Sequence, residues 1–407
     1  MNQVLKSLTF LLLVICIILI FAWKYLNAMD TPFVYDRYVT GRNFVGRKMD
    51  CTILSNLLEG GENVVMYEPP KSGKMSVIQQ TLYNRRASGK QFMVVHVNMF
   101  NVRTIEDFLV KYGTAVIRPL YSTQQEYASV VERHLGGTHF VFDPARFASC
   151  DEVVSVNWSL DANDMEQMLR LPAGIARERG VPYYVILEEF QMLMMDKRYE
   201  EVLKVLETVL SERDSQVSFI FAGSQVNAMK YIFAERKFFY RMVEYLPLQP
   251  VDDREIIEHI VRGFMQTGKV IERELVLGAC KLFRGQMWYL NHFTSICDTM
   301  TRGYLNEGIL MEALKVIISI HEPRFISLVN DLTDHQLSFM KAVLDGVVKF
   351  SSSDVIERYH LNSSANVRRV KDALKKKEVL TFNEKDEPVI FDPLFEYWIR
   401  KHYFEME

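Results

Sequence analysis

The sequence predicts an α/β fold with a parallel sheet, followed by an all-helical region and a small domain of three helices and a β-hairpin. Short runs rich in β-branched and aromatic residues alternate with helical patterns in the first 251 residues. Between residues 252 and 325 only helical patterns follow one another, and two short strand patterns flank a polar turn near the end of the chain. The chain has 407 residues, enough for two or three domains, each with its own core.

Composition excludes several classes of protein. Hydrophobic residues make up 49% of the chain and charged residues 24%, which is a globular and not a disordered composition. The formal net charge of −3 provides no overall basic field for binding nucleic acid. The five cysteines form no CxxC pair and show no Cys/His spacing that suits zinc, so we expect reduced thiols.

The N-terminus carries an uninterrupted apolar run at residues 7–23, flanked by Lys6 and Lys24. As a helix this run is just long enough to cross a bilayer core of about 30 Å. Basic residues lie mainly after the run, which predicts that the rest of the chain stays on the cytoplasmic side. We therefore expect residues 1–28 to be a single-pass anchor in the inner (cytoplasmic) membrane. Met29 is an alternative start, and the protein would then be cytoplasmic.

The first large domain is predicted over residues 29–251. Its expected strands are residues 63–67, 92–98, 183–187 and 217–222. Its expected helices are residues 74–86, 104–117, 165–178 and 200–213. Strands that alternate with helices indicate a parallel sheet covered on both faces, and ligands bind such sheets at the carboxyl ends of the strands.

Two smaller domains complete the expected chain. Residues 252–325 show helical periods only and are predicted to form a helical domain. Residues 326–407 give helices at 334–344, 353–359 and 364–376, then strands at 379–382 and 388–391. Three helices followed by a β-hairpin are the order of a winged helix.

The loop after the first expected strand is typical of a phosphate-binding loop. It runs from Glu68 through Gly73 and Lys74, so a glycine turn and a lysine stand between a strand and a helix. The P-loop pattern asks for glycine at Glu68 and for a hydroxyl-bearing Mg²⁺ ligand at Met75, and this sequence has neither. Ser76 follows one residue later and is the candidate to supply that hydroxyl.

Polar residues at the ends of two further strands support the same interpretation. Glu188 and Glu189 end the strand at 183–187, and such a pair normally gives one carboxylate to the shell of Mg²⁺ and the other to the attacking water. Glu188 stands where aspartate is usual. Ser224 follows the strand at 217–222, where it is placed to sense a γ-phosphate.

Several segments together resemble the archaeal-type P-loop ATPases of the STAND/AAA+ group, over roughly residues 30–405. The resemblance rests on residues 44–47 (FVGR), the Gly73–Lys74 loop, residues 97–104, residues 188–191 (EEFQ), residues 223–224 and residues 392–398 (DPLFEYW). It implies a nucleotide-binding α/β domain, a helical lid and a winged helix, with ATP and Mg²⁺ as cofactors. It further implies that Phe44, Gly46 and Arg47 border the adenine, that Gly73, Lys74, Met75 and Ser76 surround the phosphates, and that Ser224 is a sensor.

Arg241 is a further candidate, after Phe239 and Tyr240. It is either an arginine that reaches phosphate or a neighbouring subunit, or a surface arginine that caps a helix. Both interpretations stay open at this point.

The expected third helix of the winged helix is basic. Its cations are Arg368, Arg369, Lys371, Lys375, Lys376 and Lys377. Phosphate contact requires positive charge. Arg368 and Lys375 are seven residues apart, as are Arg369 and Lys376, so these cations lie on one solvated face of the helix. The acidic wing would repel phosphate, and no aromatic residue is interleaved to stack on bases. We therefore do not expect DNA to be the partner.

These observations predict an ATP-binding switch with degenerate Walker motifs and slow hydrolysis, hence a Mg²⁺-dependent ATPase of low activity. Two alternatives stay open: a membrane-tethered pseudo-ATPase that is a scaffold for protein–protein interaction, and a membrane-bound winged-helix regulator that binds DNA. The expected partners are nucleotide, the membrane through residues 7–23, and a protein that the sequence does not identify. Nucleotide-dependent self-association is a further expectation.

Overall fold

The computed structural model describes residues 32–212, 214–383 and 385–406. These residues form two compact units. One unit combines the described residues up to Val45 with Val251–His321, and the other combines Gly46–Pro250 with Glu322–Glu407. The division falls within one helix, α13 (Glu307–Asn330).

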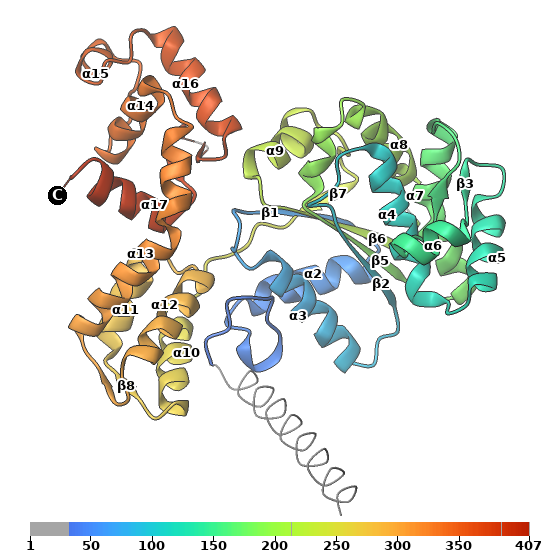
Figure 1. Cartoon of the computed structure of the whole chain (residues 1–407), viewed down its shortest axis with the longest axis horizontal. Coiled ribbons are helices and arrows are strands. Elements are labelled where there is room, and N and C mark those ends of the chain that lie inside the picture. Colours follow the sequence, from blue (N-terminus) through green and yellow to red (C-terminus); the bar gives the residue numbers. More distant parts are fainter. Residues whose placement is uncertain (1–31, 213, 384, 407) are drawn as a thin grey trace, which may run out of the picture. The chain divides into compact units, whose positions relative to one another are not determined.

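The larger unit is built on a five-stranded sheet in the order β2-β5-β6-β1-β7 (Figure 1). All four neighbouring pairs in this sheet are parallel. The strands are β1 (Asn63–Tyr67), β2 (Met93–Asn98), β5 (Tyr183–Glu188), β6 (Val217–Gly223) and β7 (Val243–Tyr245). The predicted α/β fold with a parallel sheet is therefore confirmed.

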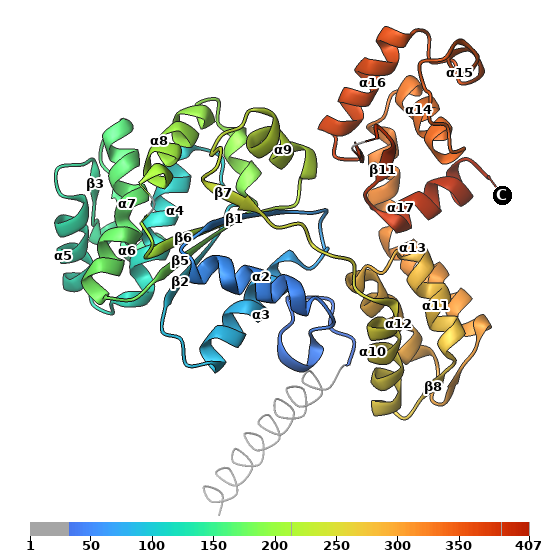
Figure 2. The same cartoon turned by 180° about the vertical axis from the view of Figure 1, so that it is seen from behind.

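Helices cover both faces of this sheet, as Figures 1 and 2 show. On one face lie α2 (Lys48–Glu59) and α3 (Lys74–Ala87), and on the other α4 (Ile105–Ile117), α7 (Ala162–Arg179) and α8 (Tyr199–Ser211). Every residue of β1 and β6 is buried, because alternate side chains enter the two helical layers. Val65, Val185 and Phe221 belong to the core with α4 and α7. These strands therefore read as continuous apolar runs.

The segment between α4 and α7 forms elements that the sequence did not predict. They are η2 (Arg118–Leu120), α5 (Gln124–Leu135), β3 (Phe140–Val141), α6 (Pro144–Cys150) and β4 (Ser155–Val156). The β3 and β4 strands pair antiparallel and are two residues long, too short to show a period-2 pattern. This insertion lies beside the edge strand β2, where α4 contacts β4.

The smaller unit is helical, as expected, but also contains a short strand pair. Its helices are α10 (Asp253–Gln266), α11 (Arg273–Leu282), α12 (Met287–Met300) and the first part of α13. Its strands β8 (Val270–Ile271) and β9 (Tyr304–Leu305) pair in parallel, so the expectation of helices alone is wrong at these residues. The chain's described start packs here: the Phe33 ring lies 4.7 Å from that of Phe264, and Asn291 Nδ2 donates to Val34 O at 2.9 Å.

The C-terminal elements have the expected winged-helix order. They are α14 (Asp334–Leu344), α15 (Ser353–Arg358), α16 (Ser364–Lys376), β10 (Leu380–Phe382) and β11 (Pro388–Ile390). The two strands pair antiparallel as a hairpin. The chain then ends in α17 (Pro393–Trp398) and η5 (Ile399–Tyr403), and α17 is capped by Asp392, which accepts hydrogen bonds from two amides of its first turn.

Among the described residues, no helix combines the length and the apolar character that a membrane span requires. The expected anchor at residues 7–23 lies outside the described part of the chain.

Candidate nucleotide-binding site

The phosphate loop joins β1 to α3 at the carboxyl edge of the sheet. Gly73 is the N-cap residue of α3 and has φ = 94°, a left-handed conformation that glycine adopts without strain. A Cβ on Gly73 would also lie 3.1 Å from Arg47 Nη1. Both the conformation and the space therefore require glycine, which confirms the strand–loop–helix context expected around this residue.

Lys74 is a buried cation at the centre of the loop. Its side chain is 7% exposed, and Nζ donates to Glu68 O at 2.7 Å and to Pro69 O at 3.0 Å. Burial lowers the pKa of Lys74 to about 8, and the charges of Glu189, Glu68 and Glu188 oppose that shift. The ammonium group is therefore held inside the loop by backbone carbonyls.

Arg47 brings a second cation to the loop. It occupies the N-cap position of α2 with φ = 53°, and its Nη1 donates to Ser72 O at 2.7 Å. Gly46 before it is buried, whereas Phe44 lies in the segment that belongs to the helical unit. Of the residues expected to border the adenine, Arg47 thus lies at the phosphate loop, and Phe44 belongs to the other unit.

The Glu68 carboxylate has a hydrogen-bond partner outside the phosphate loop. Leu248 N, in the segment that follows β7, donates to Glu68 Oε1 at 3.4 Å. Burial raises the pKa of Glu68, and the Leu248 amide and the charges of Lys74 and Arg47 oppose that shift. The acid is therefore close enough to act on Lys74 electrostatically, but its contact is with the segment after β7.

Met75 and Ser76 lie in the first turn of α3. Met75 is 8% exposed and packs in the interior, so this position offers sulfur and methyl groups where a metal-binding hydroxyl would stand. Ser76 is half-buried on the next position of the helix.

Glu188 is bound to the neighbouring strand β2. His96 Nε2 lies 2.8 Å from Glu188 Oε2, and Asn98 Nδ2 donates to the same oxygen at 2.9 Å. Parallel pairing brings these residues together, because Asn98 lies opposite Glu188 in the register of β2 and β5. Neither His96 nor Asn98 was a predicted site residue. The signal was two polar residues on the same face at the end of an otherwise apolar strand.

Glu189 and Ser224, each expected at the carboxyl end of a strand, are in contact with each other. Glu189 has φ = 58° and follows β5, and Ser224 follows β6. Ser224 Oγ and Gln191 Nε2 both donate to Glu189 Oε2, each at 2.5 Å. Gln191, in the 3₁₀ helix η3 (Phe190–Met195), was not predicted as a site residue. The two acids of the pair therefore have different partners, one on β2 and one on β6.

Arg241 lies at the opposite edge of the sheet. It precedes β7, and it lines a cavity of about 190 Å³ with Asn63 and Val217, the first residues of β1 and β6. Its guanidinium group lies 5.2 Å from the centre of the Tyr240 ring. The structure therefore does not bring Arg241 to the phosphate loop of its own chain, because it stands before its strand and not after it.

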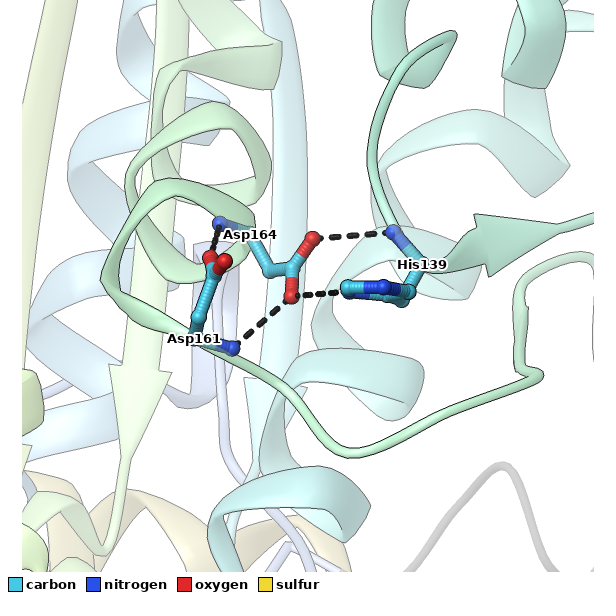
Figure 3. Close-up of side chains that lie close together, drawn as sticks. All are labelled: His139, Asp161 and Asp164. Atoms are coloured by element: carbon cyan, nitrogen blue, oxygen red, sulfur yellow. Dashed lines mark hydrogen bonds and ion pairs between the residues drawn. The ribbon is translucent and has the colours of Figure 1, made fainter.

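His139, Asp161 and Asp164 form a separate cluster with the spacing of a metal site (Figure 3). Asp164 is 1% exposed and accepts from His139 N and Asp161 N, both at 2.8 Å, while His139 Nδ1 lies 2.8 Å away. Asp161 in turn accepts from Asp164 N at 2.9 Å, which is the reciprocal capping box at the start of α7. Helix capping therefore accounts for the cluster.

A larger hollow of about 740 Å³ lies along the free edge of β2, between α4 and the insertion. Its lining includes Val94, Lys111 and Ser155 and no residue of the phosphate loop. Ion pairs between Arg118 and Asp151 and between Arg146 and Glu152 stand on its rim. This hollow is distinct from the site described here.

The residues present fit a nucleotide phosphate group. The loop offers the cations Lys74 and Arg47, and the first turn of a helix offers N–H groups without intrahelical partners. The acids Glu188 and Glu189 and the Ser76 hydroxyl suit a Mg²⁺ ion held largely through water. Met75 removes one direct ligand of that ion.

Comparison with known proteins agrees with this fold. A family model described as a probable winged helix domain matches residues 323–401. No curated protein matches the chain. A Walker-type ATPase of Pyrococcus abyssi is similar in structure, with a TM-score of 0.64 and 16% sequence identity over 91% of this chain and 99% of that one.

The ORC2 protein of Aeropyrum pernix, solved in ADPNP–ADP complexes, is also similar, with a TM-score of 0.52 and 16% identity over 87% of this chain and 93% of that one. Identities this low show a shared fold and not a shared activity. The chain therefore has the fold of a Walker-type P-loop ATPase that carries a C-terminal winged helix.

Proposed function

We propose that this chain binds ATP at the Gly73–Lys74 loop and is a nucleotide-controlled switch of the STAND/AAA+ type. The observation that carries the proposal is the convergence of Lys74, Arg47, Glu189 and Ser224 at the carboxyl edge of one parallel sheet. The similarity to the Aeropyrum pernix ORC2 protein, solved with ADPNP and ADP, supports nucleotide as the ligand.

The proposed hydrolysis is slow. Glu189 is the general base that takes a proton from the attacking water. Ser224 donates a hydrogen bond to the Glu189 carboxylate and so orients that carboxylate. Bound Mg²⁺ would supply charge neutralisation between the phosphates, with Ser76 and Glu188 holding its shell. Met75 takes away the direct hydroxyl ligand, and loss of one electrostatic stabiliser of the transition state typically costs about 3 kcal/mol.

The test is direct titration of the full-length chain with ATP, with and without Mg²⁺, beside Lys74→Ala. We expect saturable binding by the wild type and none by Lys74→Ala, because the alanine variant lacks the ammonium group at the centre of the loop. Absence of binding by the wild type under both conditions would refute the proposal.

A specific observation favours the alternative of a pseudo-ATPase scaffold. Lys74 Nζ is satisfied by loop carbonyls, and Glu188 by His96 and Asn98, so both groups already have partners within the protein. Nucleotide must replace these contacts to bind. The hydrogen bond from Leu248 N to the Glu68 carboxylate favours the first proposal, because this acid has a partner outside the loop.

The membrane anchor at residues 7–23 is a further proposal, with the rest of the chain on the cytoplasmic side and an unidentified protein as partner. It is supported by the apolar run and the basic residues that follow it. Fractionation of cells that express the native protein tests it: recovery in the membrane pellet that resists high salt is expected. Recovery in the soluble pool would favour a start at Met29.

A further inference from the structure

The hollow beside β2 lies along an open edge of the central sheet. Among the strands that the structure describes, β2 pairs with β5 alone. Met93 N and Met99 N donate to carbonyls in and next to β5, so the odd-numbered residues of β2 face that strand. In a parallel ladder the residues between them turn their N–H and C=O groups the other way. Val94, which lines the hollow, therefore presents both groups to the open edge.

The insertion between α4 and α7 stands beside this edge without sealing it. A hollow of about 740 Å³ remains, bordered by β2, α4, α6 and β4, and this volume is in the range of ligand pockets. Of the described strands, only β3 pairs with β4, so a second strand with one partner borders the hollow. Proteins usually cover or charge an open strand edge, because such an edge pairs readily with another chain. Here the edge is left beside space for an extended segment.

Apolar side chains form part of the lining. They are Val94, Val102, Val110, Ala115 and Val156. In an extended segment that adds to a sheet, alternate side chains point to the same face. Such a segment can bury every second side chain against this apolar lining while its main chain pairs with β2.

The charges of the lining favour an acidic group in the occupant. Each of the four acids has a partner within the chain: Glu106 has Arg198, Asp107 has the Thr104 amide, Asp151 has Arg118, and Glu152 has Arg146. Lys111 is exposed on α4 and makes no ion pair or hydrogen bond with any described residue. A cation left over among paired charges is complementary to a carboxylate of a partner.

A buried hydroxyl in the wall gives a second, independent indication of a ligand. Ser155 of β4 lines the hollow with a side chain that is 6% exposed, and its Oγ has no hydrogen-bond partner in the described part of the chain. A buried hydroxyl without a partner costs free energy. An extended segment offers a carbonyl oxygen at every residue and can therefore provide this partner.

We propose that the open edge of β2 is a docking site for an extended segment of a partner protein. The segment adds a strand to the sheet beside Val94, buries apolar side chains in the hollow and places a carboxylate at Lys111. The inference goes beyond the proposed function, and binding at this edge requires no nucleotide.

The experiment selects a peptide from a displayed library of random eight-residue peptides with the full-length chain, and titrates the most enriched peptide by calorimetry. We expect alternating apolar residues and at least one acid. Lys111→Glu should weaken binding about tenfold, and a peptide in which lysine replaces the acid should regain the loss in this variant. Lys204→Glu is the matched control, because Lys204 is an exposed lysine on α8 outside the hollow, and it should leave affinity unchanged.

Two further measurements test the strand and its place. Val94→Pro removes an N–H group of the open edge and should weaken binding about two- to tenfold, whereas Val94→Thr keeps that group and should not. Cys150 is exposed and lines the hollow, so bound peptide should slow its alkylation, read by mass spectrometry of the fragment that contains it.

Three results would overturn the docking site: no enriched peptide, affinity that Lys111→Glu does not change, or unchanged alkylation of Cys150 at saturating peptide. Equal affinity of a folded Val94→Pro variant and the wild type would overturn strand addition. Lys111→Glu changes an exposed side chain and decides the outcome even where Val94→Pro does not fold.

Discussion

Lys74 is the residue at which burial and function are most directly opposed. The Lys74 side chain is 7% exposed, and its Nζ donates to two backbone carbonyls. Burial disfavours the charged ammonium form and lowers the pKa of Lys74 to about 8. The group is thus easily neutralised, although a phosphate partner needs it charged. A bound nucleotide would reverse the shift, because the phosphate charge favours the ammonium form.

This lowered pKa predicts a pH dependence of stability. Between pH 8 and about 10.5 the unfolded chain keeps a proton on Lys74 that the folded chain has released, so the free energy of unfolding rises with pH in that window. The full effect of the shift is about 3 kcal/mol. Urea unfolding at pH 7 and pH 10 should therefore show a smaller gain in Lys74→Met than in the wild type. Equal gains in the two proteins would contradict the assignment.

Met75 and Glu68 predict separable effects on turnover and binding. Met75→Thr restores a metal-binding hydroxyl and should raise ATP turnover by up to about a hundredfold with a stronger dependence on Mg²⁺. Because Met75 is buried, the same change should lower stability by about 1–2 kcal/mol. Met75→Leu is the control, since it keeps the buried volume without a hydroxyl.

Glu68→Gly removes a negative charge near Lys74 and should tighten binding in a titration.

Turnover that stays at the wild-type level in Met75→Thr, with Mg²⁺ present and binding intact, would show that the missing hydroxyl does not limit hydrolysis. Weaker binding in Glu68→Gly would show that its contact with Leu248 N matters more than its charge.

At the scale of elements, the start of α7 shows how capping produces a cluster that looks like a metal site. Asp164 accepts from His139 N and Asp161 N and lies beside His139 Nδ1, so one carboxylate ties the strand β3 region to the helix (Figure 3). Hydrogen bonds from the His139 ring and from both amides lower the pKa of Asp164 against the effect of burial. This is the behaviour of a carboxylate that stabilises folded structure while ionised.

Asp164→Ala should therefore destabilise the larger unit by about 2–3 kcal/mol, because it removes a cap and leaves buried donors without partners. Asp164→Asn, which keeps the shape and one acceptor, should cost less. Thermal unfolding measures both. A rise in the melting temperature of the wild type on adding Zn²⁺, absent in Asp164→Ala, would instead identify a metal site.

The winged helix predicts weak interaction with DNA. Lys371 is paired with Asp386 at 2.6 Å, and Lys375 lies 3.9 Å from Glu235, so two cations of α16 are engaged within the chain. Arg368 and Arg369 remain exposed. Phosphate contacts by so few cations give little affinity near physiological salt, and we expect no tight gel shift by the full-length chain.

A tight complex whose affinity falls steeply with salt would contradict this expectation. Its loss in the double variant Arg368→Glu, Arg369→Glu would then assign the contact to α16, in line with the alternative of a DNA-binding regulator.

At the scale of the whole molecule, the parts predictable from sequence were those with continuous apolar runs. Strands β1, β5 and β6 are buried on both faces, so their sequences read as unbroken apolar strands. The edge strand β7, three residues long, and the two-residue strands β3, β4, β8 and β9 carry no such period. Their pairing comes from tertiary contacts, which a local pattern does not contain.

The sequence predicts those contacts of the candidate site that follow from the order of the strands. It does not predict contacts that depend on strand register or side-chain direction. Glu189 and Ser224 end neighbouring strands, so the parallel order alone brings them together. The bond from Asn98 to Glu188 requires the register of β2 against β5, which the sequence does not specify. The position of Arg241 before β7 could not be read from the sequence, because that three-residue strand was not predicted.

Nucleotide binding should stabilise the larger unit against thermal unfolding. A ligand that binds only the folded state adds RT ln(1 + [L]/Kd) to the free energy of unfolding, which is about 2.7 kcal/mol at a concentration of 100 Kd. For a unit of this size that is a shift of about 5 °C in melting temperature, measurable by calorimetry with ATP and Mg²⁺. Lys74→Ala should lose the shift, because it removes the buried cation of the loop.

Arg241→Ala is the matched control and should keep the shift, since Arg241 lines the cavity at the amino edge of the sheet, away from the phosphate loop. If the wild type, Met75→Thr and Glu68→Gly all melt at temperatures that ATP does not change, the loop is vestigial. The larger unit, in which Glu378 of the winged helix accepts from Asn227 N and Ala228 N, would then be a scaffold that does not respond to nucleotide.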